Sequence, residues 1–271
     1  MNYKIVFSDI DGTLLNKERE LSPFTIKIIK EVKEKLPVVL ISARMPDAMR
    51  HLQEELDIRD SPIIAYNGGL VLVNDQPISS VEIPMDALKA IHQFNTENNL
   101  DVHLSLYHHD EWYVPQTDFW AEREENNTKV APQIKPNAEV IEKWTSENKG
   151  PHKIMAMGDE AKIDKISEFL SKNYSEDLHF YRSNNNYLEI ANKEISKFSA
   201  IQYLLDNHYK ISTEDTIAFG DNYNDIEMVG GVGMGVAVSN ARQEVKDVAA
   251  KITGHGKEDG VAKMLQEIFS L

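Results

Sequence analysis

Short apolar runs alternate with helix-forming segments at both ends of this chain. Apolar runs lie at 3–8 and 38–42, and a helical segment follows each of them. Such alternation is typical of βαβ units, in which parallel strands form a sheet that is covered by helices on both faces. The first helix has a clear start, because Ser22 suits the N-cap and Pro23 the first helical position. We therefore expect an α/β fold with a parallel sheet.

The middle of the chain has a different rhythm. Helices are mixed there with hairpin-like pairs of short strands, a combination that favours a separate α+β module with an antiparallel sheet. After this module the alternation returns, with a helix at about 196–208 and a strand at 216–219. We therefore expect a core made of residues 1–82 and 191–271, interrupted by an inserted domain at 83–190. The helices expected in the insertion are near 85–98, 137–146 and 160–172, and the strand pairs are 101–107 with 111–114 and 178–182 with 186–190.

Charge and composition narrow the functional classes. The 271 residues can form two modules, and the net charge of -15 argues against a nucleic-acid surface, which needs Lys and Arg to neutralise phosphates. The chain has no cysteine, so a metal would be held by oxygen or imidazole ligands. No apolar run approaches the ~20 residues of a spanning helix, and the first residues do not resemble a secretion signal. We expect a cytoplasmic protein that binds neither membranes nor nucleic acid.

The most informative residues follow the first apolar run directly. Asp9 and Asp11 are two positions apart, and Gly12 and Thr13 come next. Side chains two apart on an extended backbone point to the same side, and ligands of α/β sheets bind beyond the carboxyl ends of the strands. Gly12 permits a tight turn that brings backbone amides near a bound anion. Beside a divalent ion, Asp9 can attack phosphorus as a nucleophile while Asp11 donates a proton to the leaving oxygen.

Calcium loops also contain Asp-x-Asp-Gly patterns. Their glycine is at the sixth position, a Glu is at the twelfth, and a helix lies on each side. Here an apolar strand precedes the acids, and Gly12 comes too early. A surface turn that carries acids is the other alternative, and the strand before the pair weighs against it.

Two later stretches offer groups for a phosphate and a metal. Ser42 ends an apolar run, where a hydroxyl and backbone amides at a helix N-terminus could bind an anion, although a serine there could equally be a helix cap. Asp221 follows the run at 216–219 and can supply a carboxylate to Mg²⁺, which prefers oxygen ligands and keeps several waters. Clusters of Asp and Asn also mark ordinary turns.

Lys197 opens the helix that follows the middle module. By itself a lysine is usually a solvated surface charge. A glycine-rich stretch at 230–235 has the look of a dinucleotide loop, but it precedes its strand instead of following it. We interpret that stretch as a closely packed buried strand.

Taken together, these stretches resemble the motifs of the haloacid dehalogenase-like (HAD) superfamily of phosphohydrolases. The resemblance is closest to the Cof-like branch, in which a large α+β cap is inserted between the second and third motifs. The family often has glycine where this chain has Ala43 and Phe198. The matching residues, in chain order, are Asp9-x-Asp11-Gly12-Thr13, Ser42, Lys197 and Gly220-Asp221-x-x-Asn224-Asp225.

The resemblance implies a fold and a chemistry. The fold is a Rossmann-like core with an inserted cap that selects the substrate. Asp9 is the nucleophile, Asp11 the general acid and base, and Mg²⁺ the cofactor. The metal site comprises Asp9, Asp11 and Asp221; the substrate-binding residues are Ser42, Ala43, Lys197 and Asn224; the supporting residues are Gly12, Thr13 and Asp225.

The implied activity is the hydrolysis of small phosphorylated metabolites, such as sugar phosphates, through an aspartyl-phosphate. Candidate contacts to the leaving group in the cap are His108, His109, Trp112, Tyr113 and Tyr187. Two alternatives stay open: a phosphomutase built on the same core, and a non-catalytic sensor of a phosphorylated ligand. Asp11 weighs against the sensor, because a protein that only binds does not need a proton donor at that position.

Overall fold

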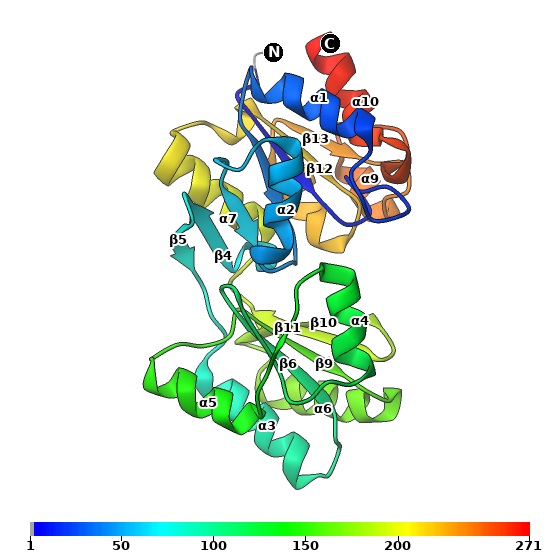
Figure 1. The fold of residues 1–271 in the computed structure, drawn as a ribbon. Coiled ribbons are helices and arrows are strands. Elements are labelled where there is room, and N and C mark those ends of the chain that lie inside the picture. Colours follow the sequence, from blue (N-terminus) through cyan, green and yellow to red (C-terminus); the bar gives the residue numbers. More distant parts are fainter. Residues whose placement is uncertain (1–2) are drawn as a thin grey trace. The chain divides into compact units, whose positions relative to one another are not determined.

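The computed structural model describes residues 3–271, which form two compact units (Figure 1). The core unit combines the chain up to Ser79 with residues Ser196–Leu271, and the inserted unit is Ser80–Ile195. The sequence prediction placed the ends of the insertion at 83 and 190. No helix described between residues 3 and 271 is both long and apolar enough to cross a bilayer.

The core unit contains an eight-stranded sheet in the order β14-β13-β12-β1-β2-β3-β4-β5. The strands from β14 to β3 are parallel, and β4 runs antiparallel to β3. Both β1 and β2 are fully buried, and they are apolar except for the last two residues of β1, as expected for central strands of a parallel sheet. The strand bounds are β1 Ile5–Asp9, β2 Val38–Ile41, β3 Ile63–Ala65, β4 Leu70–Val73, β5 Gln76–Ser80, β12 Thr216–Gly220, β13 Met234–Ala237 and β14 Lys251–Ile252.

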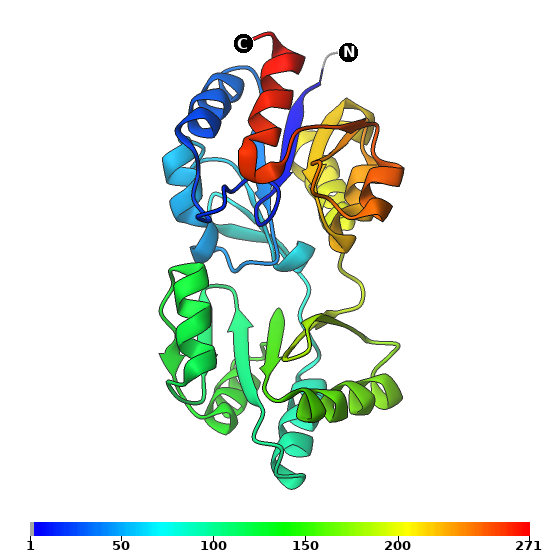
Figure 2. The same cartoon turned by 90° about the vertical axis from the view of Figure 1, so that its right-hand side faces the viewer.

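Helices lie on both faces of this sheet (Figure 2). Helix α1 packs against α2 and α10, while α8 packs against α7 and α9. The predicted start of α1 is confirmed, since the Ser22 side chain accepts a hydrogen bond from Thr25 N. The bounds are α1 Pro23–Lys33, α2 Asp47–Leu56, α7 Lys197–Leu204, α8 Ile226–Gly231, α9 Gln243–Val248 and α10 Gly260–Phe269. The predicted α/β class with a parallel-sheet core is therefore confirmed.

The inserted unit has its own six-stranded sheet in the order β10-β11-β9-β6-β7-β8. Its strands pair in antiparallel fashion except β7 with β8. One apolar cluster joins the sheet to α3, α5 and α6, and it includes Tyr113, which the sequence had suggested as a substrate contact. The bounds are α3 Met85–Glu97, β6 His103–His108, β7 Glu111–Val114, α4 Phe119–Thr128, β8 Gln133–Ile134, α5 Asn137–Ser146, β9 Lys153–Met157, α6 Glu160–Asn173, β10 Leu178–Asn184 and β11 Tyr187–Asn192.

Strand β1 marks the point at which the strand order of the core sheet reverses. The chain runs from β1 to β2 and β3 on one side, and it returns with β12, β13 and β14 on the other. In open α/β sheets the crevice at such a reversal, beyond the carboxyl ends of the strands, is where ligands bind. The segments that follow β1 and β12 begin at this edge, so the topology brings Asp9 and Asp221 together.

Candidate active site

Asp9 lies at the end of β1 with its side chain buried. One carboxylate oxygen, Oδ1, accepts a hydrogen bond from Lys197 Nζ at 2.6 Å. The other oxygen, Oδ2, is buried and has no hydrogen-bond partner among the described residues. A buried carboxylate oxygen without a partner is costly, because it has lost its hydration. Asp9 therefore offers one open oxygen atom next to a fixed positive charge.

Lys197 is the first residue of α7 and is 1% exposed. Its Nζ also donates to Asp225 Oδ1 at 2.6 Å. Burial lowers the pKa of Lys197, but the charges of Asp225 and Asp9 outweigh that effect, and the pKa is raised above the usual lysine value. The lysine is thus charged, and it joins two segments that are far apart in the sequence.

Asp225 is fully buried and uses both of its oxygens for hydrogen bonds. While Oδ1 accepts from Lys197, Oδ2 accepts from the backbone N–H groups of Asp221 and Asn222 at 2.9 and 3.0 Å. A carboxylate with this many bonds shapes the loop that follows β12. It has little capacity left for a metal.

Asp221 faces the turn that follows β1. Its Oδ1 accepts a hydrogen bond from Thr13 Oγ1 at 3.0 Å. Gly12 has a φ of +93°, and a Cβ atom at this position would lie 2.5 Å from Asp221 Oδ2. Position 12 therefore requires glycine for two reasons: the backbone is left-handed there, and the Asp221 carboxylate lies where a side chain would begin.

These residues fit a divalent cation. Ligand oxygens of Asp9, Asp221 and Asp225 lie within 4.8 Å of one another, and Lys197 donates hydrogen bonds to two of these carboxylates. Because Asp225 is committed to Lys197 and to backbone amides, the open oxygen of Asp9 and the Asp221 carboxylate are the best donors. One or two carboxylates are what Mg²⁺ usually takes from a protein.

Burial and the crowding of these carboxylates also change the pKa values of Asp9 and Asp221. Burial raises the pKa of Asp9 well above its usual value; Lys197 opposes this, and the charges of Asp225 and Asp221 raise the pKa further. Burial, and then the charge of Asp225, raise the pKa of Asp221 from 3.8 to about 6. Without a cation, the folded site therefore holds protons that the unfolded chain has already lost.

We expect Asp221→Asn to stabilise the metal-free protein at pH 8. The folded pKa of Asp221 is raised, so its favourable contribution exists at low pH and is lost as the pH rises from about 4 through 6. The amide keeps the Thr13 hydrogen bond without the charge, so the gain at pH 8 should be roughly 1–2 kcal/mol after allowance for partial exposure. The gain should shrink toward pH 5.

Urea unfolding in EDTA at pH 5 and pH 8 measures this difference. Histidines with lowered pKa, such as His152, give a slope of the opposite sign, but they are present in both proteins and cancel. A gain of equal size at both pH values would contradict the assignment of the charge to Asp221. Added Mg²⁺ should reverse the order of stability at pH 8, because only the wild type keeps both open carboxylates.

Asp11 is not a member of the group formed by Asp9, Asp221 and Asp225, and two arginines bind its carboxylate. Arg44 binds it in a bidentate manner, with Nε 2.7 Å from Oδ2 and Nη2 2.8 Å from Oδ1. Arg19 Nη2 donates to the same Oδ1 at 2.9 Å. Burial raises the pKa of Asp11, but the bonds and charges of Arg44 and Arg19 outweigh it, and the pKa is lowered. The Asp11 side chain is thus an ion-paired carboxylate and is not grouped with Asp9, Asp221 and Asp225 as a metal ligand.

Ser42 is buried directly after β2 but does not cap a helix. Helix α2 begins only at Asp47, and the Ser42 hydroxyl accepts a hydrogen bond from Arg44 N at 3.2 Å. Ala43 lies between them in the loop.

Asn224 is exposed, and its Nδ2 donates to Asn67 Oδ1 at 2.9 Å, in the turn between β3 and β4. The serine and the asparagine are thus placed on the loops that follow β2 and β12.

Two further features were not foreseen from the sequence. Asn240 donates from Nδ2 to Gly12 O at 2.9 Å and accepts from Gly256 N at 2.7 Å, so it holds the turn that follows β1.

The ring of Phe198 occupies the space beside Gly231, where a Cβ atom would lie 2.4 Å from the ring. The interpretation of residues 230–235 as one buried strand was therefore wrong: the stretch contains the end of α8 and the start of β13, and Gly231 makes room for the ring of Phe198.

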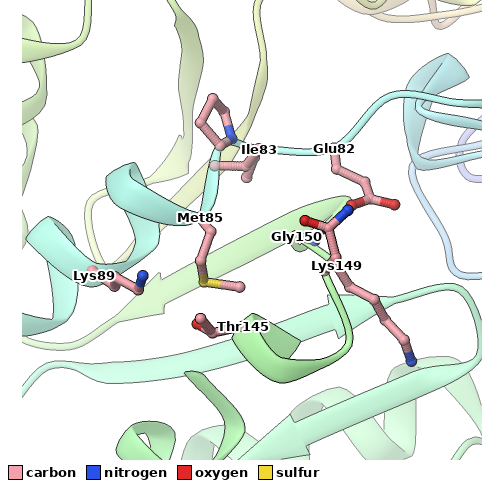
Figure 3. A pocket seen from close by; sticks show the side chains of 9 residues that line it. Glu82, Ile83, Met85, Lys89, Thr145, Lys149 and Gly150 are labelled. Carbon is pink, nitrogen blue, oxygen red and sulfur yellow. Dashed lines mark hydrogen bonds between the residues drawn. The ribbon is translucent and has the colours of Figure 1, made fainter. Parts of the chain in front are cut away.

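The inserted unit holds a separate pocket of about 300 Å³ (Figure 3). Residues 82–85 and 145–150 contribute to its lining, together with Lys89. Figure 3 shows the Glu82 carboxylate beside Gly150, whose N–H it accepts at 2.5 Å. None of the site residues predicted from the sequence lines this pocket.

Among the described residues, Glu82, His108 and His152 form a second group with metal-binding side chains. His152 Nδ1 accepts a hydrogen bond from His109 N at 3.2 Å, so the ring proton is on Nε2. That nitrogen lies 3.0 Å from Ser80 Oγ and donates to it. Because neither ring nitrogen of His152 is left to bind a cation, this group is a hydrogen-bond network.

Comparisons with known proteins find relatives that carry phosphatase names and a solved structure with a similar fold. A Haemophilus influenzae protein that carries a phosphatase name is 35% identical over 272 residues, which cover 99% of each chain. A Bacillus subtilis relative, named 5-amino-6-(5-phospho-D-ribitylamino)uracil phosphatase, is 29% identical over 98% of each chain. A haloacid dehalogenase-like hydrolase from Bacteroides thetaiotaomicron has a similar structure, with a TM-score of 0.90 at 27% identity, covering 98% of this chain and 100% of the other.

A family model also covers almost the whole chain. The model describes haloacid dehalogenase-like hydrolases and matches residues 6–265, which include all four motifs and the inserted unit. The resemblance inferred from the sequence is therefore confirmed, and the chain belongs to the haloacid dehalogenase-like hydrolase family.

Proposed function

We propose that this hydrolase is a Mg²⁺-dependent phosphatase that releases phosphate from small phosphorylated metabolites through an aspartyl-phosphate on Asp9. The observation that carries the proposal is the Asp9 carboxylate, with one oxygen bound to Lys197 and the other buried without a partner beside Asp221. A nucleophile of this kind needs an open oxygen and nearby positive charge to accept an anionic substrate.

The hydrogen bonds of these residues support the roles that we propose for them. An oxygen of Asp9 attacks phosphorus and forms the acyl phosphate, while the bond to the leaving alcohol breaks. Lys197 offsets the negative charge beside the attacked group, and Asp225 keeps the lysine in place. A Mg²⁺ ion held by Asp9 and Asp221 would supply further positive charge to the phosphoryl oxygens.

Asp11 is the proposed proton donor and acceptor. It gives a proton to the departing oxygen, and it then takes a proton from the water that hydrolyses the aspartyl-phosphate. In the structure the carboxylate is bound to Arg44 and Arg19, so its action requires release from at least one of these bonds.

Substrate choice is proposed to lie in the inserted unit, acting as a cap whose residues contact the leaving group. The 5-amino-6-(5-phospho-D-ribitylamino)uracil phosphatase name of two Bacillus subtilis relatives favours a phosphorylated sugar or sugar alcohol as the substrate class. A phosphomutase on the same core would return the phosphoryl group to a sugar phosphate. Product analysis separates the two, since free phosphate indicates hydrolysis and an isomerised sugar phosphate indicates transfer.

Metal removal tests the proposed activity. We expect the protein to release phosphate from p-nitrophenyl phosphate in Mg²⁺, to lose at least about 99% of this turnover in excess EDTA, and to regain it when Mg²⁺ is restored. Calcium, which matches the charge but takes more ligands at longer distances, is the control and should support far less turnover. Equal turnover with and without EDTA would contradict the metal dependence, and absence of any phosphate release would favour the sensor.

A further inference from the structure

Arg19 occupies a tight turn that is built independently of its side chain. Asn16 Oδ1 accepts from the backbone N–H groups of Glu18 and Glu20 at 2.9 and 3.0 Å, and Arg19 N donates to Asn16 O at 3.1 Å. Arg19 itself has a φ of +63°. A residue with a Cβ atom pays roughly 1 kcal/mol for this left-handed conformation, which glycine or asparagine adopts more easily. The turn alone would thus favour a residue other than arginine.

The side chain accounts for an arginine at this position. Its guanidinium reaches Asp11 Oδ1, which also accepts a hydrogen bond from Arg44. Residues that break a local backbone preference tend to occur at functional sites, where the side chain compensates. Here the side chain brings a second positive charge to the proposed general acid.

The two arginines on Asp11 differ in how firmly they are held. Arg44 has a side chain that is 8% exposed, makes both bonds of a bidentate pair and donates from Nη1 to Ala48 O at 3.2 Å. The Arg19 side chain is half-exposed, at 50%, and donates to Asp11 Oδ1 from Nη2. A hydrogen bond from a half-exposed arginine contributes little free energy, whereas a bidentate pair made by a buried arginine is costlier to break. Arg19 is therefore the partner of Asp11 that can leave.

We propose that Arg19 is an exchangeable positioning residue: its guanidinium moves from Asp11 to the phosphoryl group of an incoming phosphate monoester, and Arg44 alone then holds Asp11. This inference rests on the proposed phosphatase function and adds a substrate contact to it. A phosphate dianion has more charge than a carboxylate and three acceptor oxygens, so it competes well for a guanidinium. The exchange couples substrate arrival to the release of one of the bonds that restrain Asp11.

Arg19→Gly tests this exchange without a folding defect. Glycine suits the positive φ, so we expect an unfolding midpoint at or above that of the wild type. Loss of the guanidinium should raise KM for p-nitrophenyl phosphate, and the inhibition constant of inorganic phosphate, about tenfold, because a hydrogen bond between charged groups is removed. The kcat value should stay within about twofold, and Arg19→Lys should recover about a third or more of the lost affinity.

Lys210→Gly is the matched control. It removes a positive charge at another exposed left-handed position of the core unit, with a φ of +56°, and it should change neither constant. An unchanged KM and phosphate inhibition constant in Arg19→Gly would overturn the proposal. So would a fall in kcat with KM unchanged, which would mean that Arg19 only orients Asp11.

Binding of inorganic phosphate to the full chain, measured by calorimetry in Mg²⁺, separates this inference from the proposed function. If the wild type releases no phosphate from any ester yet binds inorganic phosphate about tenfold more tightly than Arg19→Gly, the phosphatase proposal fails and the anion contact of Arg19 holds. Equal binding by the two proteins overturns the contact, whatever the activity.

Discussion

Asp9→Asn should reduce phosphatase turnover by about 10⁴-fold or more, because an amide oxygen cannot form the acyl phosphate. The variant should still fold. The amide has the shape of the carboxylate, it can still accept the Lys197 hydrogen bond, and it removes a charge whose burial is unfavourable. A purified variant with an unchanged circular dichroism spectrum and no phosphate release is the expected outcome.

Asp11→Asn is the control for this experiment, since it makes the same chemical change two residues away. It should slow turnover strongly, yet with a good leaving group such as p-nitrophenolate the aspartyl-phosphate should still form, and a burst of nitrophenol should precede the slow steady state. Acid-quenched protein should then carry phosphate in Asp11→Asn and none in Asp9→Asn. Wild-type turnover in the Asp9 variant would remove this residue as the nucleophile.

Lys197→Met is expected to have the second-largest effect, on both activity and stability. The apolar side chain has a similar length, but it leaves Asp9 and Asp225 buried without their shared cation. Removal of one partner from a buried ion pair costs about 3–5 kcal/mol of unfolding free energy. Turnover should fall about 10²- to 10³-fold, because the charge beside the phosphoryl group is lost.

Mg²⁺ should restore part of the stability of Lys197→Met, since a divalent ion also screens Asp9 and Asp221. Urea unfolding with and without Mg²⁺, together with kcat and KM, measures both effects. Lys35→Met is a suitable control, because that lysine is exposed and its ammonium group contacts Phe269 at the surface, far from the acidic residues in the sequence. If Lys197→Met kept full turnover and unfolded at the same urea concentration as the wild type, Lys197 would have neither role.

The fold could be predicted from the sequence where its periodicity was strong. The central strands β1 and β2 consist mostly of consecutive apolar residues, and α1 starts with a good N-cap followed by proline, so each pattern predicted one kind of element. Helix α4 was missed, since Ala121 is its one buried residue and its sequence is rich in Glu and Asn. Strand β9 was also missed. It is a central strand of the inserted sheet and pairs with β6 on one side and β11 on the other, and these partners come from other segments of the chain.

The juxtaposition of the candidate site residues could also be predicted from the sequence. An acid at the end of β1 and one directly after β12 come close together, because parallel neighbours in a sheet end at the same edge. Lys197 by itself only weakly indicated a functional residue, since a lysine at a helix start is usually exposed. Its position in the order of the four motifs is what identified it as a candidate.

What the sequence determined by itself was the class of fold and the segments that carry the reactive groups, because strand and motif patterns are local and repeat with known periods. The tertiary structure alone decided how these groups pair: that Asp225 shares Lys197 with Asp9, that Asp11 is bound to Arg44 and Arg19, and that Asn240 holds the Gly12 turn. The reason is physical. Ion pairs and hydrogen bonds of this kind depend on distances of a few ångströms between residues up to hundreds of positions apart, and no period in the sequence encodes them.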